Sequence, residues 1–140
     1  MLTVLCVLKS GGIYTAQWVE KLMHGVGRNL TVPYRFKCLS DVDVPCDRIV
    51  LEDLWPGWWA KIALFKPGII TSPTLYIDLD TIIVGNIDSM SDLPYSFAML
   101  RSFNDLETAA SGVMWFRDVP HIVYDKFKED PEHYIEYHGE

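Results

Sequence analysis

Two aspartates, Asp78 and Asp80, stand one residue apart in the apolar run TLYIDLDTIIVGNID, which covers residues 74–88. Side chains two positions apart on a strand point to the same face, so the sequence predicts that both carboxylates lie on one face, with their Cα atoms about 6.6 Å apart. Two anionic groups at this distance repel each other, and a divalent cation between them would remove the repulsion. Hard oxygen ligands of this kind suit Mg²⁺ or Mn²⁺, which also bind phosphate oxygens.

A simpler interpretation is a pair of solvated aspartates at the end of a strand, because Asp is common in turns. The flanking sequence argues against it. Leu75–Ile77 and 82–84 are strongly apolar, and a polar turn seldom lies between two such runs. We therefore expect a functional role for the pair.

The elements that must position these aspartates alternate along the chain. Apolar and β-branched runs predict strands, and apolar residues at helical spacing predict helices. Strands that alternate with helices favour an α/β layer fold with a mainly parallel sheet. Strands are predicted at 2–8, 34–39, 49–51, 75–77, 82–84, 97–100 and 112–116, helices at about 15–29 and 58–65, and a partly helical tail at 120–140.

In parallel sheets, ligands bind beyond the carboxyl ends of the strands. Three polar segments follow predicted strands and are expected to line one crevice. They are Lys9–Gly11, Ser40–Asp41 and Asp78–Asp80.

Length and composition exclude several classes of protein. The 140 residues fit a single domain, 1–140, and the net charge of −7 (12 basic minus 19 acidic residues) leaves no basic stripe for nucleic acid. Residues 2–8 read as a strand rather than a signal peptide, and no apolar run is long enough to span a bilayer, so a cytoplasmic protein is expected. Cys6 and Cys38 fall in strand-like runs and are expected to be buried, reduced thiols.

Five segments in this order resemble GT-A nucleotide-sugar glycosyltransferases of the family-8-like branch. The most specific is the DxD strand YIDLD with IVG behind it; together they cover 76–80 and 83–85. The others are the strand and SGG loop at 7–12, YRFKCLSD at 34–41, PGWWAKI at 56–62 and SGVMW at 111–115. The resemblance covers nearly the whole chain and implies a Rossmann-like GT-A fold, a mainly parallel central sheet flanked by helices.

The resemblance also implies an activity. The protein would be a hexosyltransferase-like enzyme that transfers a sugar from a nucleotide-diphosphate sugar, most simply a UDP-sugar, to a carbohydrate, protein or lipid-linked acceptor. Val7, Leu8 and Ser10 would lie near the base and ribose, while Asp78 and Asp80 would hold Mn²⁺ (or Mg²⁺). The donor sugar, the acceptor and the stereochemical outcome stay open.

Further donor contacts follow from the same resemblance. Lys61 would face the donor, although an exposed helix lysine is an equal alternative, and Ser111 with Gly112 would let the sugar approach the backbone, although they could simply begin a strand. One of Trp58 and Trp59 is expected in the core, and the other is left open. Arg101 is a weaker candidate for a phosphate or sugar contact.

A second family fits the acidic motif literally. Asp78-Leu79-Asp80-Thr81 matches the DxDxT motif of haloacid-dehalogenase-like phosphatases, in which Asp78 would attack phosphorus and Asp80 would act as acid and base. That motif usually opens its domain, whereas two or three strands precede it here. The glycosyltransferase resemblance is therefore favoured.

Relatives in the glycosyltransferase family usually continue beyond a point equivalent to Gly139–Glu140, with an acidic-Gln segment and a C-terminal part that closes the acceptor site. The chain is therefore expected to be a partial domain, and a donor-binding fragment without turnover is the alternative to an active transferase. An apolar patch left by the missing part would favour a homo-oligomer.

Overall fold

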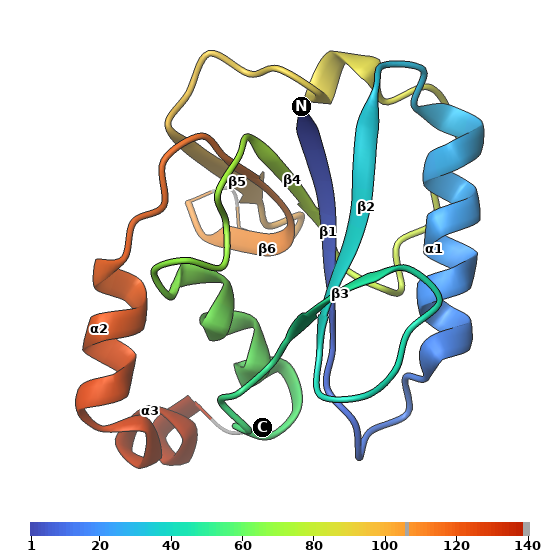
Figure 1. Cartoon of the computed structure of the whole chain (residues 1–140). Coiled ribbons are helices and arrows are strands. Elements are labelled where there is room, and N and C mark those ends of the chain that lie inside the picture. The colour runs from blue at the N-terminus through green and yellow to red at the C-terminus, as the bar shows by residue number, and fades with distance from the viewer. Residues whose placement is uncertain (106, 139–140) are drawn as a thin grey trace.

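The computed structural model describes residues 1–105 and 107–138, so the expected start of the acidic-Gln segment at Gly139–Glu140 lies outside the described residues. Six strands form one sheet, and helical segments cover both of its faces (Figure 1). In chain order the elements are β1 (Leu2–Leu8), α1 (Ala16–Asn29), β2 (Tyr34–Ser40), β3 (Asp47–Val50), the 3₁₀ helix η1 (Gly57–Phe65), β4 (Thr74–Ile77), the short 3₁₀ helix η2 (Asp88–Met90), β5 (Phe97–Arg101), β6 (Ala109–Phe116), α2 (Ile122–Glu129) and α3 (Pro131–His138).

The sheet has the order β3-β2-β1-β4-β6-β5. The first four strands are mutually parallel, and β6 pairs antiparallel with both β4 and β5. The predicted α/β fold with a mainly parallel, Rossmann-like sheet is therefore confirmed. The chain places β4 beside β1 at the centre, which brings the ends of these two strands next to each other.

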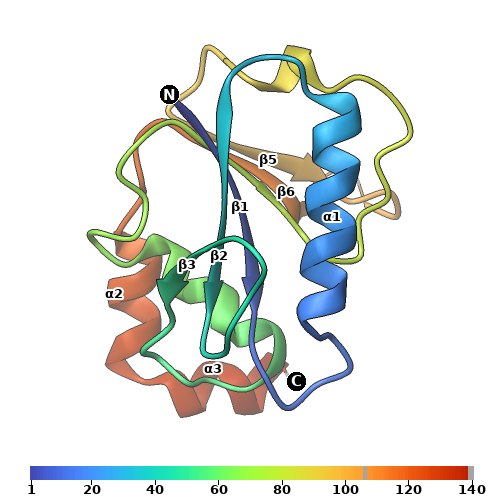
Figure 2. The same ribbon diagram turned by 45° about the vertical axis from the view of Figure 1, so that its right-hand side comes forward.

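Each face of the sheet has its own hydrophobic core. On one face, α1 packs its buried residues Val19, Leu22 and Val26 against β1 and β4. The opposite face carries η1 and α2, whose Leu64 and Tyr124 pack over it. Figure 2 shows α1 separated by the sheet from η1 and α2. Both faces are apolar because the central strands are covered on both sides.

Side chains of β4 and the residues after it alternate between these two cores. Leu75, Ile77 and Leu79 pack on the α1 side, and Tyr76 packs on the η1 side. This is the alternation that the sequence predicted. It orients the segment that carries the two aspartates, although the strand itself ends at Ile77.

The predicted strand at 82–84 is wrong. The backbone turns after β4, where the Thr81 amide donates to the Asp78 carbonyl at 3.1 Å, and the chain then runs outside the sheet. Ile82 and Val84 are 84% and 94% exposed, and Ile83 alone of the three packs against the α1-side core. The predicted short helix at 58–65 is present, but as a 3₁₀ helix.

Cys6 and Cys38 are free and buried, as predicted. They are register partners on β1 and β2. Hydrogen bonding with Cys38 and burial raise the pKa of the Cys6 thiol, so this thiol stays protonated and packs as a small apolar side chain. Within the described ranges, no helix is both long and apolar enough to cross a bilayer.

Candidate functional site

A cavity of about 750 Å³ opens beyond the carboxyl ends of β1 and β4. Its walls come from three stretches of the chain that the fold brings together. They are residues 7–14, which end β1 and lead into α1; residues from 54 to 61, which lead into η1; and the end of β4, with Tyr76, Asp78, Leu79 and Asp80. This is the position where parallel α/β sheets bind their ligands.

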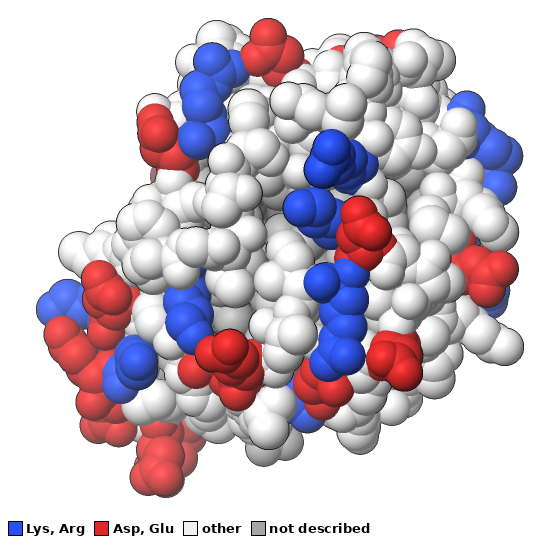
Figure 3. All heavy atoms as spheres, viewed as in Figure 1, with Lys and Arg blue, Asp and Glu red and all other residues white. Residues whose placement is uncertain are grey.

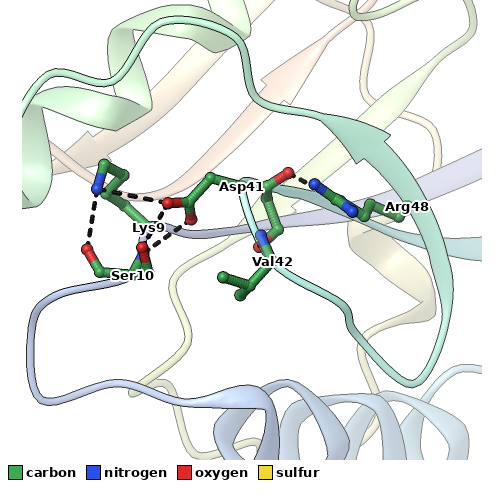
Figure 4. A network of polar contacts seen from close by, with 6 residues as sticks. Lys9, Ser10, Asp41, Val42 and Arg48 are labelled. Atoms are coloured by element: carbon green, nitrogen blue, oxygen red, sulfur yellow. Dashed lines mark hydrogen bonds and ion pairs between the residues drawn. The ribbon is translucent and has the colours of Figure 1, made fainter.

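Asp41, at the end of β2, fixes the loop after β1 (Figure 4). Ser10 donates to its carboxylate twice, from the backbone amide at 2.8 Å and from the hydroxyl. The Lys9 ammonium lies 3.5 Å from the same carboxylate and donates to the Ser10 carbonyl at 2.9 Å. Burial alone would raise the pKa of Asp41, but the Ser10 hydrogen bonds and Lys9 outweigh it and lower that pKa. Asp41 is thus a charged clamp that holds Ser10 of the cavity wall in place.

The same polar network extends to β3. Arg48 donates from Nε to the Ser40 carbonyl at 3.0 Å, and the Val42 amide donates to the Ser40 hydroxyl at 3.1 Å (Figure 4). These contacts hold the start of the loop after β2. The expectation that Ser40 and Asp41 line the crevice is wrong, because they hold the lining from behind.

Asp78 is the better-fixed of the two acidic side chains. The Lys61 ammonium lies 2.7 Å from its Oδ1, and the Tyr76 hydroxyl donates to the same oxygen. Both contacts fall on Oδ1, so within the described ranges Oδ2 has no hydrogen-bond partner. Burial, followed by the Asp78 charge, raises the pKa of Tyr76, which keeps this hydroxyl protonated as a donor.

Asp80 is held more loosely and is exposed. The Tyr14 hydroxyl, which comes from the segment before α1, donates to its Oδ2 at 3.1 Å. That hydrogen bond is the main reason that the pKa of Tyr14 is raised. Asp80 and Asp78 therefore border the same cavity but are held by groups from opposite faces of the sheet.

Ser111 and Gly112 of β6 stand behind this acidic pair. Lys61 donates to the Ser111 hydroxyl at 3.1 Å, and the Asp78 amide donates to the Gly112 carbonyl at 2.9 Å. A methyl group on Gly112 would lie 3.6 Å from Asp78 Oδ2. β6 therefore positions Lys61 and Asp78 without bordering the cavity itself.

The sequence-predicted residues divide into two groups. Most of them border the cavity, namely Val7, Leu8, Ser10, Lys61, Asp78 and Asp80, and two lie behind it, namely Ser111 and Gly112. Arg101, at the end of β5, is exposed and outside the lining. The expectation that one of Trp58 and Trp59 lies in the core is wrong: Trp58 is exposed and borders the cavity, and Trp59 is half-buried and stacks on Phe127.

Two tyrosines were missed by the sequence reasoning. Tyr76 could have been found, because it shares a strand face with Asp78 two positions away. Tyr14 could not, because nothing in the sequence links it to Asp80.

The chemistry of this donor set fits a hard divalent cation that shares its coordination with a phosphate. Across the described part of the chain, no group of three or more His, Cys, Asp or Glu residues could hold a metal ion. Two carboxylates at one cavity are nevertheless enough for Mg²⁺-type sites, in which one or two carboxylates act together with substrate phosphates and water. Lys61 and Lys9, which both border the cavity, add positive charge that suits an anionic ligand.

Comparison with solved structures identifies the fold. The glycosyltransferase GlyE of Streptococcus pneumoniae TIGR4 matches with a TM-score of 0.68 and 17% identity, over 94% of this chain and 39% of that one. Its apo form matches with a TM-score of 0.61 and 15% identity over the same shares. The chain thus spans about two fifths of the length of these neighbours. No protein-family model and no curated protein matches it. The chain has a Rossmann-like α/β fold of the kind found in this glycosyltransferase.

Proposed function

We propose that this chain is the donor-binding region of a metal-dependent glycosyltransferase of GT-A, family-8-like type. The observation that carries the proposal is that Asp78 and Asp80 border one cavity with Lys61, beyond the ends of β1 and β4. The fold shared with a glycosyltransferase supports it. The donor would be a nucleotide-diphosphate sugar, most simply a UDP-sugar.

In this proposal the chain's residues bind and orient the donor. Val7, Leu8 and Ser10 form the wall for the base and ribose, and the Asp41 clamp keeps that wall in place. Asp78 and Asp80 would hold Mn²⁺ or Mg²⁺. When bound, the cation supplies Lewis-acid stabilisation of the diphosphate charge that grows as the sugar leaves.

Lys61 has a separate part in the proposal. Its ammonium, 2.7 Å from Asp78 Oδ1, orients that carboxylate in the absence of the donor. Since Lys61 borders the cavity, its charge is also available to a phosphate or to the donor sugar. Asp78 and Asp80 would hold the cation, and the positive charge of Lys61 offsets part of their negative charge. The cavity could therefore accept a diphosphate although the chain has a net charge of −7.

Calorimetric titration with UDP, in the presence and absence of Mn²⁺, tests the proposal. We expect UDP to bind at least tenfold more tightly with Mn²⁺, and Asp80→Ala to remove this gain. Asp118→Ala is the matched control, because Asp118 is an exposed carboxylate outside the cavity lining. Equal UDP affinity with and without Mn²⁺ would contradict the proposal. Hydrolysis of p-nitrophenyl phosphate that is lost in Asp78→Asn would favour the phosphatase alternative instead.

A further inference from the structure

Trp58 is the exposed member of the chain's five tryptophans. It is 61% exposed, whereas Trp115 is buried and the remaining three are half-buried. Trp58 borders the cavity, and the neighbouring Leu54, which is 64% exposed, borders it as well. A large aromatic surface left open at the mouth of a charged cavity is a feature of ligand sites.

The indole of Trp58 is backed by an ordered row of aromatic rings. It packs edge-to-face on Trp59, with ring centroids 6.3 Å apart and an interplanar angle of 84°. Trp59 in turn stacks on Phe127 of α2 at 5.2 Å and 18°. Phe127 is buried. Trp58 is therefore held against a fixed support while one part of its ring faces the solvent.

The 3₁₀ geometry of η1 aligns Trp58 with the charged pair. In a 3₁₀ helix the side chains at positions i and i+3 eclipse each other, and Lys61 lies three positions after Trp58. Both border the cavity, and Lys61 is paired with Asp78. The cavity thus presents an aromatic and aliphatic wall at its mouth, in line with charged groups deeper inside.

A pyranose ring has the surface that this wall would recognise. Its C–H face is apolar and packs on an aromatic ring, while its hydroxyls remain free to meet polar groups at the edge. We propose that Trp58 and Leu54 form a subsite for a pyranose ring of the acceptor, which is therefore a glycan. The proposal rests on the proposed function, which assigns β1 to the nucleoside and Lys61 with Asp78 to the donor, so that the wall at the mouth is left for the acceptor.

NMR of the tryptophan indole N–H signals tests this subsite. Trp58→Phe assigns the Trp58 signal, and the probes are the methyl β-glycosides of glucose, galactose and N-acetylglucosamine at millimolar concentrations. At least one probe should shift the Trp58 signal. Trp58→Ala should weaken its binding at least tenfold, and Trp58→Phe, which keeps a stacking ring, less than threefold. Phe103→Ala is the matched control, because Phe103 is 99% exposed and outside the cavity lining.

Titration of the same variants with UDP and Mg²⁺ separates this inference from the proposed function. Unchanged UDP affinity in Trp58→Ala, together with weaker glycoside binding, supports the acceptor subsite. Loss of UDP affinity in Trp58→Ala would overturn the acceptor subsite and favour a nucleobase stacked on Trp58. The absence of any glycoside-induced shift would also overturn the acceptor subsite. If a glycoside binds at Trp58 but UDP does not bind the unmodified protein, the sugar subsite stands and the donor-site proposal fails.

Discussion

Asp41→Asn should destabilise the protein, because one carboxylate carries the contacts that join the loops after β1 and β2. Asn keeps one acceptor oxygen for the Ser10 amide, but its NH₂ group cannot accept from the Ser10 hydroxyl, and the attraction to Lys9 is lost. A hydrogen bond to a charged group contributes about 1.5–3 kcal/mol, and a partly exposed ion pair at most about 1 kcal/mol. We expect a loss of about 2–3 kcal/mol in the free energy of unfolding at pH 7, measured by urea denaturation with tryptophan fluorescence.

The pH dependence of this loss follows from the lowered pKa of Asp41. A carboxylate whose folded pKa lies below its unfolded value of about 3.9 stabilises the protein above that pH, and the contribution disappears as the pH falls through the folded pKa. The difference in unfolding free energy between Asp41→Asn and the unmodified protein should therefore have its full value at pH 7. It should begin to shrink below about pH 4 and vanish below the folded pKa of Asp41.

Asp43→Asn is the control for the clamp, since Asp43 lies in the same loop and forms its 3.5 Å contact with Arg48 at the surface. It should cost less than about 0.5 kcal/mol. Equal stability of Asp41→Asn and the unmodified protein at pH 7, or a gap that persists unchanged in acid, would refute the reasoning.

Three further substitutions test the core and the site. Leu64→Ala empties a fully buried position over the sheet and should cost about 2–5 kcal/mol in urea denaturation. Gly112→Ala should fold normally, because its methyl group meets Asp78 Oδ2 at an ordinary 3.6 Å, but it should weaken Mn²⁺-dependent UDP binding in calorimetry. Lys61→Met removes the contacts to Asp78 and Ser111, so UDP affinity should fall at least tenfold, while Lys61→Arg should recover part of it. Unchanged UDP affinity in Lys61→Met would show that the lysine serves stability alone.

The sequence predicted the elements that have a clear hydrophobic period. The buried β1 and the amphipathic α1 lie within a residue of their expected limits. Residues 82–84 misled the prediction because their β-branched composition is typical of a strand. Composition does not show whether a neighbouring strand edge is available, and the turn after Asp78 carries this segment outside the sheet.

The sequence predicted the acidic pair of the candidate site, but it did not predict the contacts that hold this pair and the cavity wall in place. Asp78 and Asp80 stand out because carboxylates interrupt an apolar run. The contact between Lys61 and Ser111 depends on β6 lying next to β4 in the sheet. The structure shows this strand order, but the hydrophobic pattern of each segment of the sequence does not. Asp41 was expected as lining, but a strand-end position cannot distinguish a group that faces a ligand from one that clamps the adjacent loop.

The surface of the protein carries charged side chains of both signs. Acidic and basic side chains are interspersed on the face seen in Figure 3, without a continuous basic stripe. A nucleotide diphosphate would have to be attracted locally, at the cavity.

The most direct test of the account is a crystal structure of the protein with UDP and Mn²⁺, with the metal located by anomalous scattering. The account predicts one manganese peak at coordination distance from carboxylate oxygens of Asp78 and Asp80 and from the diphosphate. A manganese peak elsewhere, or UDP bound outside the cavity, would contradict it.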